Sequence, residues 1–304
     1  MKSLRTMLRL GVALGLLGQL YCANRPAVAD EETPAGTRVY TLRYKFTPGE
    51  TLRWQVEHRA QVRTTVAGTT QTAETLSRSV KAWTIDTVDD EQTKLVYHVE
   101  KVDMRQKFDG RQETTYNSDT DEAPPAGFGD VAKAVGVPLA TITLNDRGKV
   151  LKCEQKFVQA APEQEYITLP LPEKGVAVGE HWFEPADITV NLKDGRSKKI
   201  KARQRYLLKD VSAGVATIQL ETELLTPVRD PEIEAQLVQS KANGIVRFDI
   251  DAGRIVSQRS DVDEHVVGFE GDGTSLHYVQ RFSEEFLSDA KKTALGPQAP
   301  VKRK

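Results

Sequence analysis

The densest cluster of chemically active side chains lies near the C-terminal end of the sequence, where Asp261, Asp263, Glu264 and His265 follow one another closely. On a β-strand, successive side chains alternate between the two faces, so Asp261, Asp263 and His265 would share one face and could hold a divalent cation. The solvated side of an edge strand or a loop has the same pattern. We favour this second interpretation and expect no metal ion here.

Two further groups of acidic residues also have both a functional and a structural interpretation. Asp249 and Asp251 would share a strand face and could act as paired carboxylates, since acid–base catalysis needs two acids in different environments. An Asp-x-Gly turn explains Asp251 without catalysis. Asp119, Asp121 and Glu122 precede two prolines and are typical of an exposed acidic loop. Neither group predicts an active site.

Recognisable catalytic motifs are missing from the sequence. There is no His-Glu-x-x-His pattern, no Gly-x-Ser-x-Gly elbow and no glycine loop for phosphate. The five histidines are spread among separate predicted strands: His58, His98, His181, His265 and His277. We therefore expect a non-enzymatic protein with no catalytic residue and no cofactor, and a hydrolase acting through Asp249 or Asp263 is the least favoured alternative.

The large aromatic side chains are the best candidates for a binding role. Core packing is the default interpretation, because large aromatics dominate the interior of sheet proteins. The alternative is that some of them line an apolar ligand cavity between a sheet and a helix. Both interpretations require the same inward residues, so the candidate lining is taken as Trp54, Trp83, Trp182, Phe183 and Phe248.

Composition places the chain among soluble globular proteins. It has 304 residues, of which 39% are hydrophobic and 28% charged, with a formal net charge of -1. Nucleic-acid binding is not expected, because the chain has no overall basic character.

The N-terminus has the pattern of a secretory signal peptide. Lys2, Arg5 and Arg9 precede the apolar run 10–17, and small residues follow up to Ala29. The run is shorter than the roughly 20 residues of a membrane span, so we expect cleavage near Ala29, export to the periplasm or medium, and no transmembrane span in the mature chain.

Cleavage would remove Cys22 and leave Cys153 alone, so no internal disulfide is expected. Acylation of Cys22 is the disfavoured alternative, because bulky Tyr21 precedes it. Strand alternation places Cys153 on the inner face as a buried, unreactive thiol, because no nearby motif supplies an activating base.

Most of the remaining chain has the period of a half-buried β-strand. Between Leu52 and Val66 the apolar residues fall on even positions and the charged ones on odd positions. Residues 39–46 show the same alternation. Two short helices are expected as well, at 128–135 and from Asp230 to about Lys241, the second with an N-cap and a first-turn proline.

The strands and helices occur in an order that suggests an internal duplication. Asp146-Arg147-Gly148-Lys149 and Asp251-Ala252-Gly253-Arg254 each join two strands, and each follows one of the helices. We therefore expect a mainly β protein of two duplicated, curved antiparallel units, each with one short α-helix. Coincidence of turn chemistry is the alternative. The predicted divisions are a signal peptide (1–29), a flexible segment (30–38), two β-rich units (39–169 and 170–288) and a disordered basic tail (289–304).

The leader, the Tyr-rich segment 40–44, Pro48-Gly49-Glu50 and the paired Asp-x-Gly hairpins resemble a family of uncharacterised exported bacterial proteins that carry a domain of unknown function. The resemblance covers nearly the whole mature chain and implies no functional residue. At the level of fold, the long curved strands with a covering helix are similar to the half-barrels of periplasmic lipoprotein carriers, which bind acyl chains on the concave side.

These expectations lead to one preferred function and one alternative. The preferred function is the binding of a hydrophobic or lipid-like ligand, or of a partner segment, on a concave apolar face. The alternative is a structural or interaction module of the cell envelope that has no small-molecule ligand and uses exposed strand edges and the basic tail.

Overall fold

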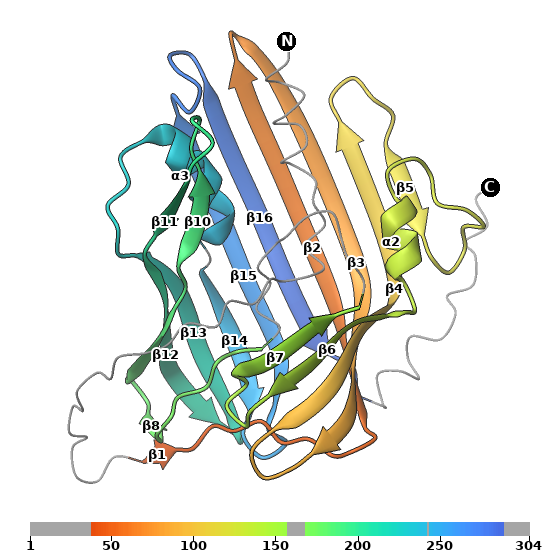
Figure 1. Ribbon diagram of the computed structural model, residues 1–304, viewed down its shortest axis with the longest axis vertical. Coiled ribbons are helices and arrows are strands. Elements are labelled where there is room, and N and C mark those ends of the chain that lie inside the picture. The colour runs from red at the N-terminus through yellow and green to blue at the C-terminus, as the bar shows by residue number, and fades with distance from the viewer. Residues whose placement is uncertain (1–37, 157–167, 242, 289–304) are drawn as a thin grey trace.

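The computed structural model describes residues 38–156, 168–241 and 243–288, and most of them lie in β-strands (Figure 1). The predicted leader, most of the predicted flexible segment and the predicted basic tail fall outside the described residues. One twelve-stranded antiparallel sheet dominates, in the order β7-β6-β4-β3-β2-β16-β15-β14-β13-β12-β9, with β5 paired to β4. The mainly β character and the curved antiparallel sheet are as the sequence predicts.

The N-terminal part of the chain supplies six strands of this sheet: β2 (Thr51–Val66), β3 (Thr69–Val88), β4 (Thr93–Phe108), β5 (Thr114–Asn117), β6 (Pro138–Leu144) and β7 (Val150–Gln155). The C-terminal part supplies the other six: β9 (His181–Pro185), β12 (Ala202–Ser212), β13 (Val215–Leu224), β14 (Asn243–Asp249), β15 (Arg254–Val267) and β16 (Ser275–Phe286). The two sets join where β2 pairs with β16 along twelve residue pairs, from Phe286 opposite Trp54 to Ser275 opposite Thr65. These twelve strands therefore form one continuous sheet.

Two small pairs lie outside the main sheet, β1 (Val39–Tyr40) with β8 (Val176–Ala177) and β10 (Ile188–Asn191) with β11 (Ser197–Ile200). The second pair is a hairpin that turns at Asp194 and Gly195, as the Asp-Gly dipeptide indicates. Its buried residues Val190 and Ile200 pack against helix α3 (Pro231–Leu237), so the hairpin extends the core beyond the sheet.

The period-two pattern of β2 separates two faces of the sheet. Its even residues Leu52, Trp54 and Val56 are buried on the inner, concave face, which is the side that carries the two helices. Its odd residues lie on the outer face, where Arg53 pairs with Glu100 and Glu57 with Arg59. A ladder of such ion pairs continues across the outer face, as expected for a solvated surface.

The two predicted helices are present. Helix α2 (Gly129–Ala134) packs Val131 and Ala134 into the cluster beneath β4 and β5. Helix α3 (Pro231–Leu237) begins at Asp230, whose side chain accepts a hydrogen bond from the Glu232 amide, and continues into the 3-10 turn η1 (Val238–Ser240). Among the described residues, no helix is long and apolar enough to cross a membrane.

Residues 41–46 do not form the long first strand that their alternation indicates. Leu42 and Tyr44 are buried as the pattern requires, but the strand β1 ends at Tyr40. The segment instead passes between two hairpin turns: the Tyr44 amide donates to the Asp146 carbonyl at 2.7 Å and the Lys45 amide to the Gly253 carbonyl at 3.0 Å. Single hydrogen bonds to turns replace a strand ladder there.

Candidate functional site

The large aromatic side chains of the inner face gather in two packed clusters, which form the lower part of that face. In the lower part, the indoles of Trp54 and Trp83 lie 4.7 Å apart between ring centroids within one packed cluster. Phe248 and Trp182 belong to a second cluster, where Trp182 stacks on Tyr206 at 5.3 Å. These four of the candidate lining residues are buried in packed clusters.

Phe183, the fifth candidate, lies on the opposite face of the edge strand β9. It is 40% exposed, and the Arg203 guanidinium lies over its ring at 4.1 Å. Adjacent residues of a strand point to opposite faces, so Trp182 and Phe183 do not face a common site. The lining role of the five aromatics stays a prediction.

A buried ion pair lies on the inner face where the two parts of the sheet join. Lys81 of β3 and Glu284 of β16 are 2.6 Å apart across β2, with side chains 11% and 1% exposed. The Lys81 ammonium lies 5.3 Å from the ring centroid of Trp54 and 5.4 Å from that of Trp83. Gln258 also donates to Glu284. Trp83 Nε1 is buried without a hydrogen-bond partner among the described residues.

Above this pair, the floor of the inner face is made mostly of small side chains. On β2 and β3, Ala60 lies opposite Thr75 and His58 opposite Ser77. On the other side of β2, Phe282 of β16 lies opposite His58. All five residues are half-buried. The alternation of side chains along each strand is enough to place each of them on the inner face. That they lie side by side depends on strand pairing, including that of β2 with β16, which joins residues more than 200 positions apart.

Helix α3 and the turn η1 cover one side of this floor. Val238 packs with Val262 and Val266 of β15, and Ala60 and Leu276 border the same cluster. Helix α2 lies over the other side, near β4 (Figure 1). The floor between the helices therefore combines small side chains with an apolar rim.

His58 is the titratable group of this floor. Burial lowers its pKa from the ordinary range, and a hydrogen bond with Gln280 acts in the opposite direction without restoring it. The imidazole is therefore held in its neutral form near pH 7.

Asp261 and Asp263, which the sequence singled out, lie on the outer face, where each forms a hydrogen bond or ion pair with a basic side chain. Partial burial acts to raise the pKa of Asp261, but hydrogen bonds from Arg281 and Arg259 outweigh it and hold that pKa below its usual range. Asp263 accepts from His277 Nε2 at 2.7 Å. Asp261, Asp263 and His265 do share one face, and among the described residues no three His, Cys, Asp or Glu side chains are grouped as metal ligands.

The other acidic candidates have local partners. Asp249 Oδ1 accepts from the Ala252 amide within the turn before β15. Asp119 pairs with Lys101 at 2.7 Å, and Asp121 accepts from the Asn117 amide. These contacts account for the acids as turn and surface residues.

Cys153 lies opposite Ile142 and borders the first packed cluster. Burial raises the pKa of its thiol, with the neighbouring Glu154 adding to the effect. The side chain is half-buried rather than fully buried as expected from the sequence, and a thiol with a raised pKa has little of the reactive thiolate near neutral pH.

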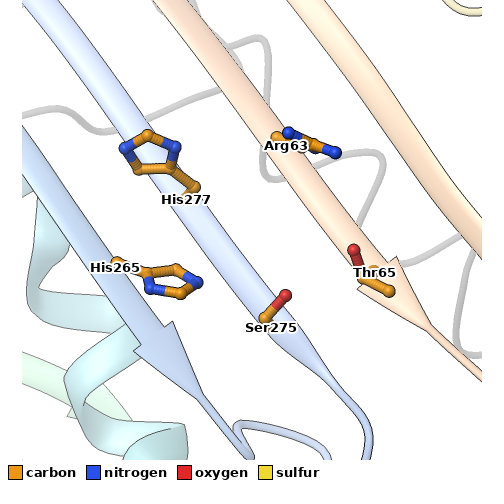
Figure 2. A pocket seen from close by; sticks show the side chains of 5 residues that line it. All are labelled: Arg63, Thr65, His265, Ser275 and His277. Carbon is orange, nitrogen blue, oxygen red and sulfur yellow. The ribbon is translucent and has the colours of Figure 1, made fainter. Parts of the chain in front are cut away.

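A second polar group lies on the outer face, and the sequence reasoning singled out only one of its members, His265, as part of the acidic cluster. Arg63, Thr65, His265, Ser275 and His277 line a shallow hollow of about 350 Å³ (Figure 2). The residues come from β15, β16 and β2, so only the strand pairing brings them together.

No family model and no curated protein matches this chain. Among solved structures, one of lipovitellin, described by its lipid–protein interactions, is 11% identical with a TM-score of 0.44; the match covers 80% of this chain but only 26% of that one. DynF from the dynemicin biosynthesis pathway of Micromonospora chersina is 8% identical over 88% of this chain and 95% of its own, with a TM-score of 0.22.

A DUF1329 family protein from Desulfovibrio piger is 11% identical over 78% of this chain and 88% of its own, with a TM-score of 0.13. These TM-scores are all below 0.5. None of these similarities therefore carries an argument about this chain.

Proposed function

We propose that this is an exported, non-catalytic binding protein that holds a hydrophobic or lipid-like ligand on the inner face between α2 and α3. The observation that carries the proposal is the difference in side-chain size between the lower and upper parts of that face. Large aromatics fill the lower part, whereas in the upper part three inner positions of β2 and β3 carry short side chains, Ala60, Thr75 and Ser77, beside His58 and Phe282. Short side chains beside an apolar rim suit an acyl chain or another slender apolar group.

The distribution of charge supports a binding rather than a catalytic role for this face. On the inner face, Lys81 pairs with Glu284 and Lys241 pairs with Glu264, so the charges within each pair neutralise each other. His58, neutral and bonded to Gln280, supplies a hydrogen-bonding group for the polar end of an amphipathic ligand.

The proposal includes the descent of the two parts of the sheet from one duplicated unit. The hairpins β6–β7 and β14–β15 each follow a helix, and their turns both contact residues 43–45 from opposite sides. Equivalent hairpins on a shared segment are what a duplicated unit would leave.

The test is ligand binding by the whole mature chain. Native mass spectrometry of protein purified from its host without detergent should show a bound hydrophobic molecule, and a fluorescent fatty acid, cis-parinaric acid, should bind saturably. Thr75→Trp fills the proposed floor and should weaken this binding by at least about tenfold, which corresponds to about 1.4 kcal/mol.

Glu74→Trp is the matched control, because it adds the same side chain to the exposed outer face of the same strand. It should leave binding unchanged. The proposal fails if neither a co-purified nor an added hydrophobic molecule binds. That result would favour an envelope interaction module that pairs through the edge strands β7 and β9.

A further inference from the structure

The hollow on the outer face is built by strand register rather than by a loop. His265, His277 and Arg63 lie directly opposite one another on β15, β16 and β2, in one row across three strands. Ser275 and Thr65 form the next row, two residues along. Figure 2 shows the five side chains gathered on these three neighbouring strands.

Arg63 differs from its neighbours on the outer face in having no acidic partner. Arg59, four residues earlier on the same face of β2, pairs with Glu57 at 2.7 Å, and Arg281 of β16 pairs with Asp261 at 2.6 Å. For Arg63, no carboxylate among the described residues lies within ion-pair distance. Its guanidinium is exposed beside His277 and Thr65 with its donors available.

The acidic side chains around the hollow each have another hydrogen-bond or ion-pair partner. Asp263 is bonded to His277, Asp261 is held by two arginines, and on β3 Glu74 accepts from Gln61. Asp109, the remaining acid near this edge of β3, accepts from the Thr72 amide. The hollow itself is lined by a guanidinium, two imidazoles and two hydroxyls, and by no carboxylate. The guanidinium is a pure donor, the Ser275 and Thr65 hydroxyls can each donate one hydrogen bond, and the Thr65 hydroxyl also contacts that of Thr70.

We propose that this hollow binds an oxyanion of the phosphate class, with Arg63 as the principal anchor. A guanidinium offers paired donors that match phosphate oxygens, and the hydroxyls of Thr65 and Ser275 can donate to the remaining oxygens. The site is independent of the inner-face site, because it lies on the opposite side of the sheet. The phosphate could belong to free inorganic phosphate or to a lipid headgroup.

A metal ion is the competing occupant, because His265 and His277 are a cross-strand pair with ring centroids 5.7 Å apart. The anion is favoured for two reasons. Arg63, next in the row, would repel a cation, and no carboxylate among the residues that line the hollow would offset that repulsion.

The experiment uses the whole mature chain and two histidine signals in NMR. Inorganic phosphate should shift the ring resonances of His265 and His277 saturably at fixed pH and leave that of His181, on the distant strand β9, in place. Arg63→Gln should weaken the affinity by about tenfold, the loss expected for a hydrogen bond to a charged group. Arg59→Gln is the matched control and should have no effect.

Sedimentation with vesicles of phosphatidylcholine, with and without phosphatidylglycerol, distinguishes a lipid headgroup from free inorganic phosphate as the ligand. Binding to the anionic vesicles that is lost in Arg63→Gln assigns a lipid headgroup, and phosphate binding without vesicle binding assigns the free ion. The proposal is overturned if phosphate causes no saturable shift, if Arg59→Gln weakens binding as much as Arg63→Gln, or if zinc but not phosphate moves the two histidine signals.

Discussion

His58 and Lys81 are polar residues at inner-face positions of their strands. Both occupy inward positions, where the alternation of β2 and β3 predicts apolar residues. Lys81 is accommodated by Glu284 and two indoles. His58 is accommodated by remaining neutral beside Gln280. Removing one partner of the buried ion pair would be strongly destabilising, because it would leave an uncompensated buried charge.

The lowered pKa of His58 makes stability depend on pH. In the unfolded chain an ordinary histidine gains its proton near pH 6.5, whereas the folded protein resists protonation until lower pH. The unfolded state therefore binds more protons as the pH falls below about 6.5, and the free energy of unfolding decreases over that window. Carboxylates with lowered pKa values change the free energy of unfolding only at more acid pH, where they gain protons in the unfolded chain.

We therefore expect His58→Gln to lose less unfolding free energy between pH 7.5 and pH 5.5 than the unaltered chain. Urea denaturation followed by circular dichroism at the two pH values measures this difference. His181→Gln, at an exposed position of β9, should behave like the unaltered chain. An unchanged pH dependence in His58→Gln would show that another group is responsible.

The two Asp-x-Gly hairpins act together through the segment that they enclose. Gly148 approaches the ring of Tyr44, and Gly253 approaches the backbone of Lys45, so that an added Cβ would lie 2.5 Å from an atom of that segment in each case. Both glycines also have positive φ, of 74° and 62°. The glycines are therefore needed for packing as well as for turn geometry.

Gly253→Ala should consequently destabilise the protein by about 2–4 kcal/mol, because the strain of positive φ adds to an overpacking clash with the Lys45 backbone. Gly195→Ala is the comparison, since Gly195 has a φ of 82° but nothing within 4 Å of an added Cβ. It should cost only the backbone strain, about 1 kcal/mol. Urea midpoints measure both, and equal losses would mean that the contact with Lys45 contributes nothing.

The elements were predictable where the signal is local. The long strand β2 follows from its alternation, and α3 follows from its N-cap and first-turn proline. Residues 41–46 were predicted as a strand because burial alternates there too, but strand formation requires a neighbour, and the sequence does not show that two turns take that place. For the same reason Ala60 and Thr75, or Arg63 and His277, could be assigned to faces but not assembled into sites.

The pairing of β2 with β16 brings the beginning and the end of the described sheet together. Contacts across this boundary are more than backbone hydrogen bonds: Trp54 Nε1 donates to the Ile255 carbonyl at 2.9 Å, and Lys81 reaches Glu284 over β2. Both buried clusters also contact Phe46. A division into two independently stable parts would break all of these contacts and expose both clusters to water.

The chain should therefore unfold as one cooperative unit, and its three tryptophans allow a direct test. Trp54 and Trp83 report on the first cluster and Trp182 on the second. We expect the fluorescence midpoint in urea to coincide with the circular dichroism midpoint in Trp182→Phe, which retains the first two reporters, and also in the Trp54→Phe, Trp83→Phe double variant, which retains Trp182. Comparing the two probes within each variant removes the effect of the substitutions on overall stability. A fluorescence midpoint displaced from the dichroism midpoint, in opposite directions in the two variants, would mean that the β2–β16 boundary separates two domains that unfold one after the other.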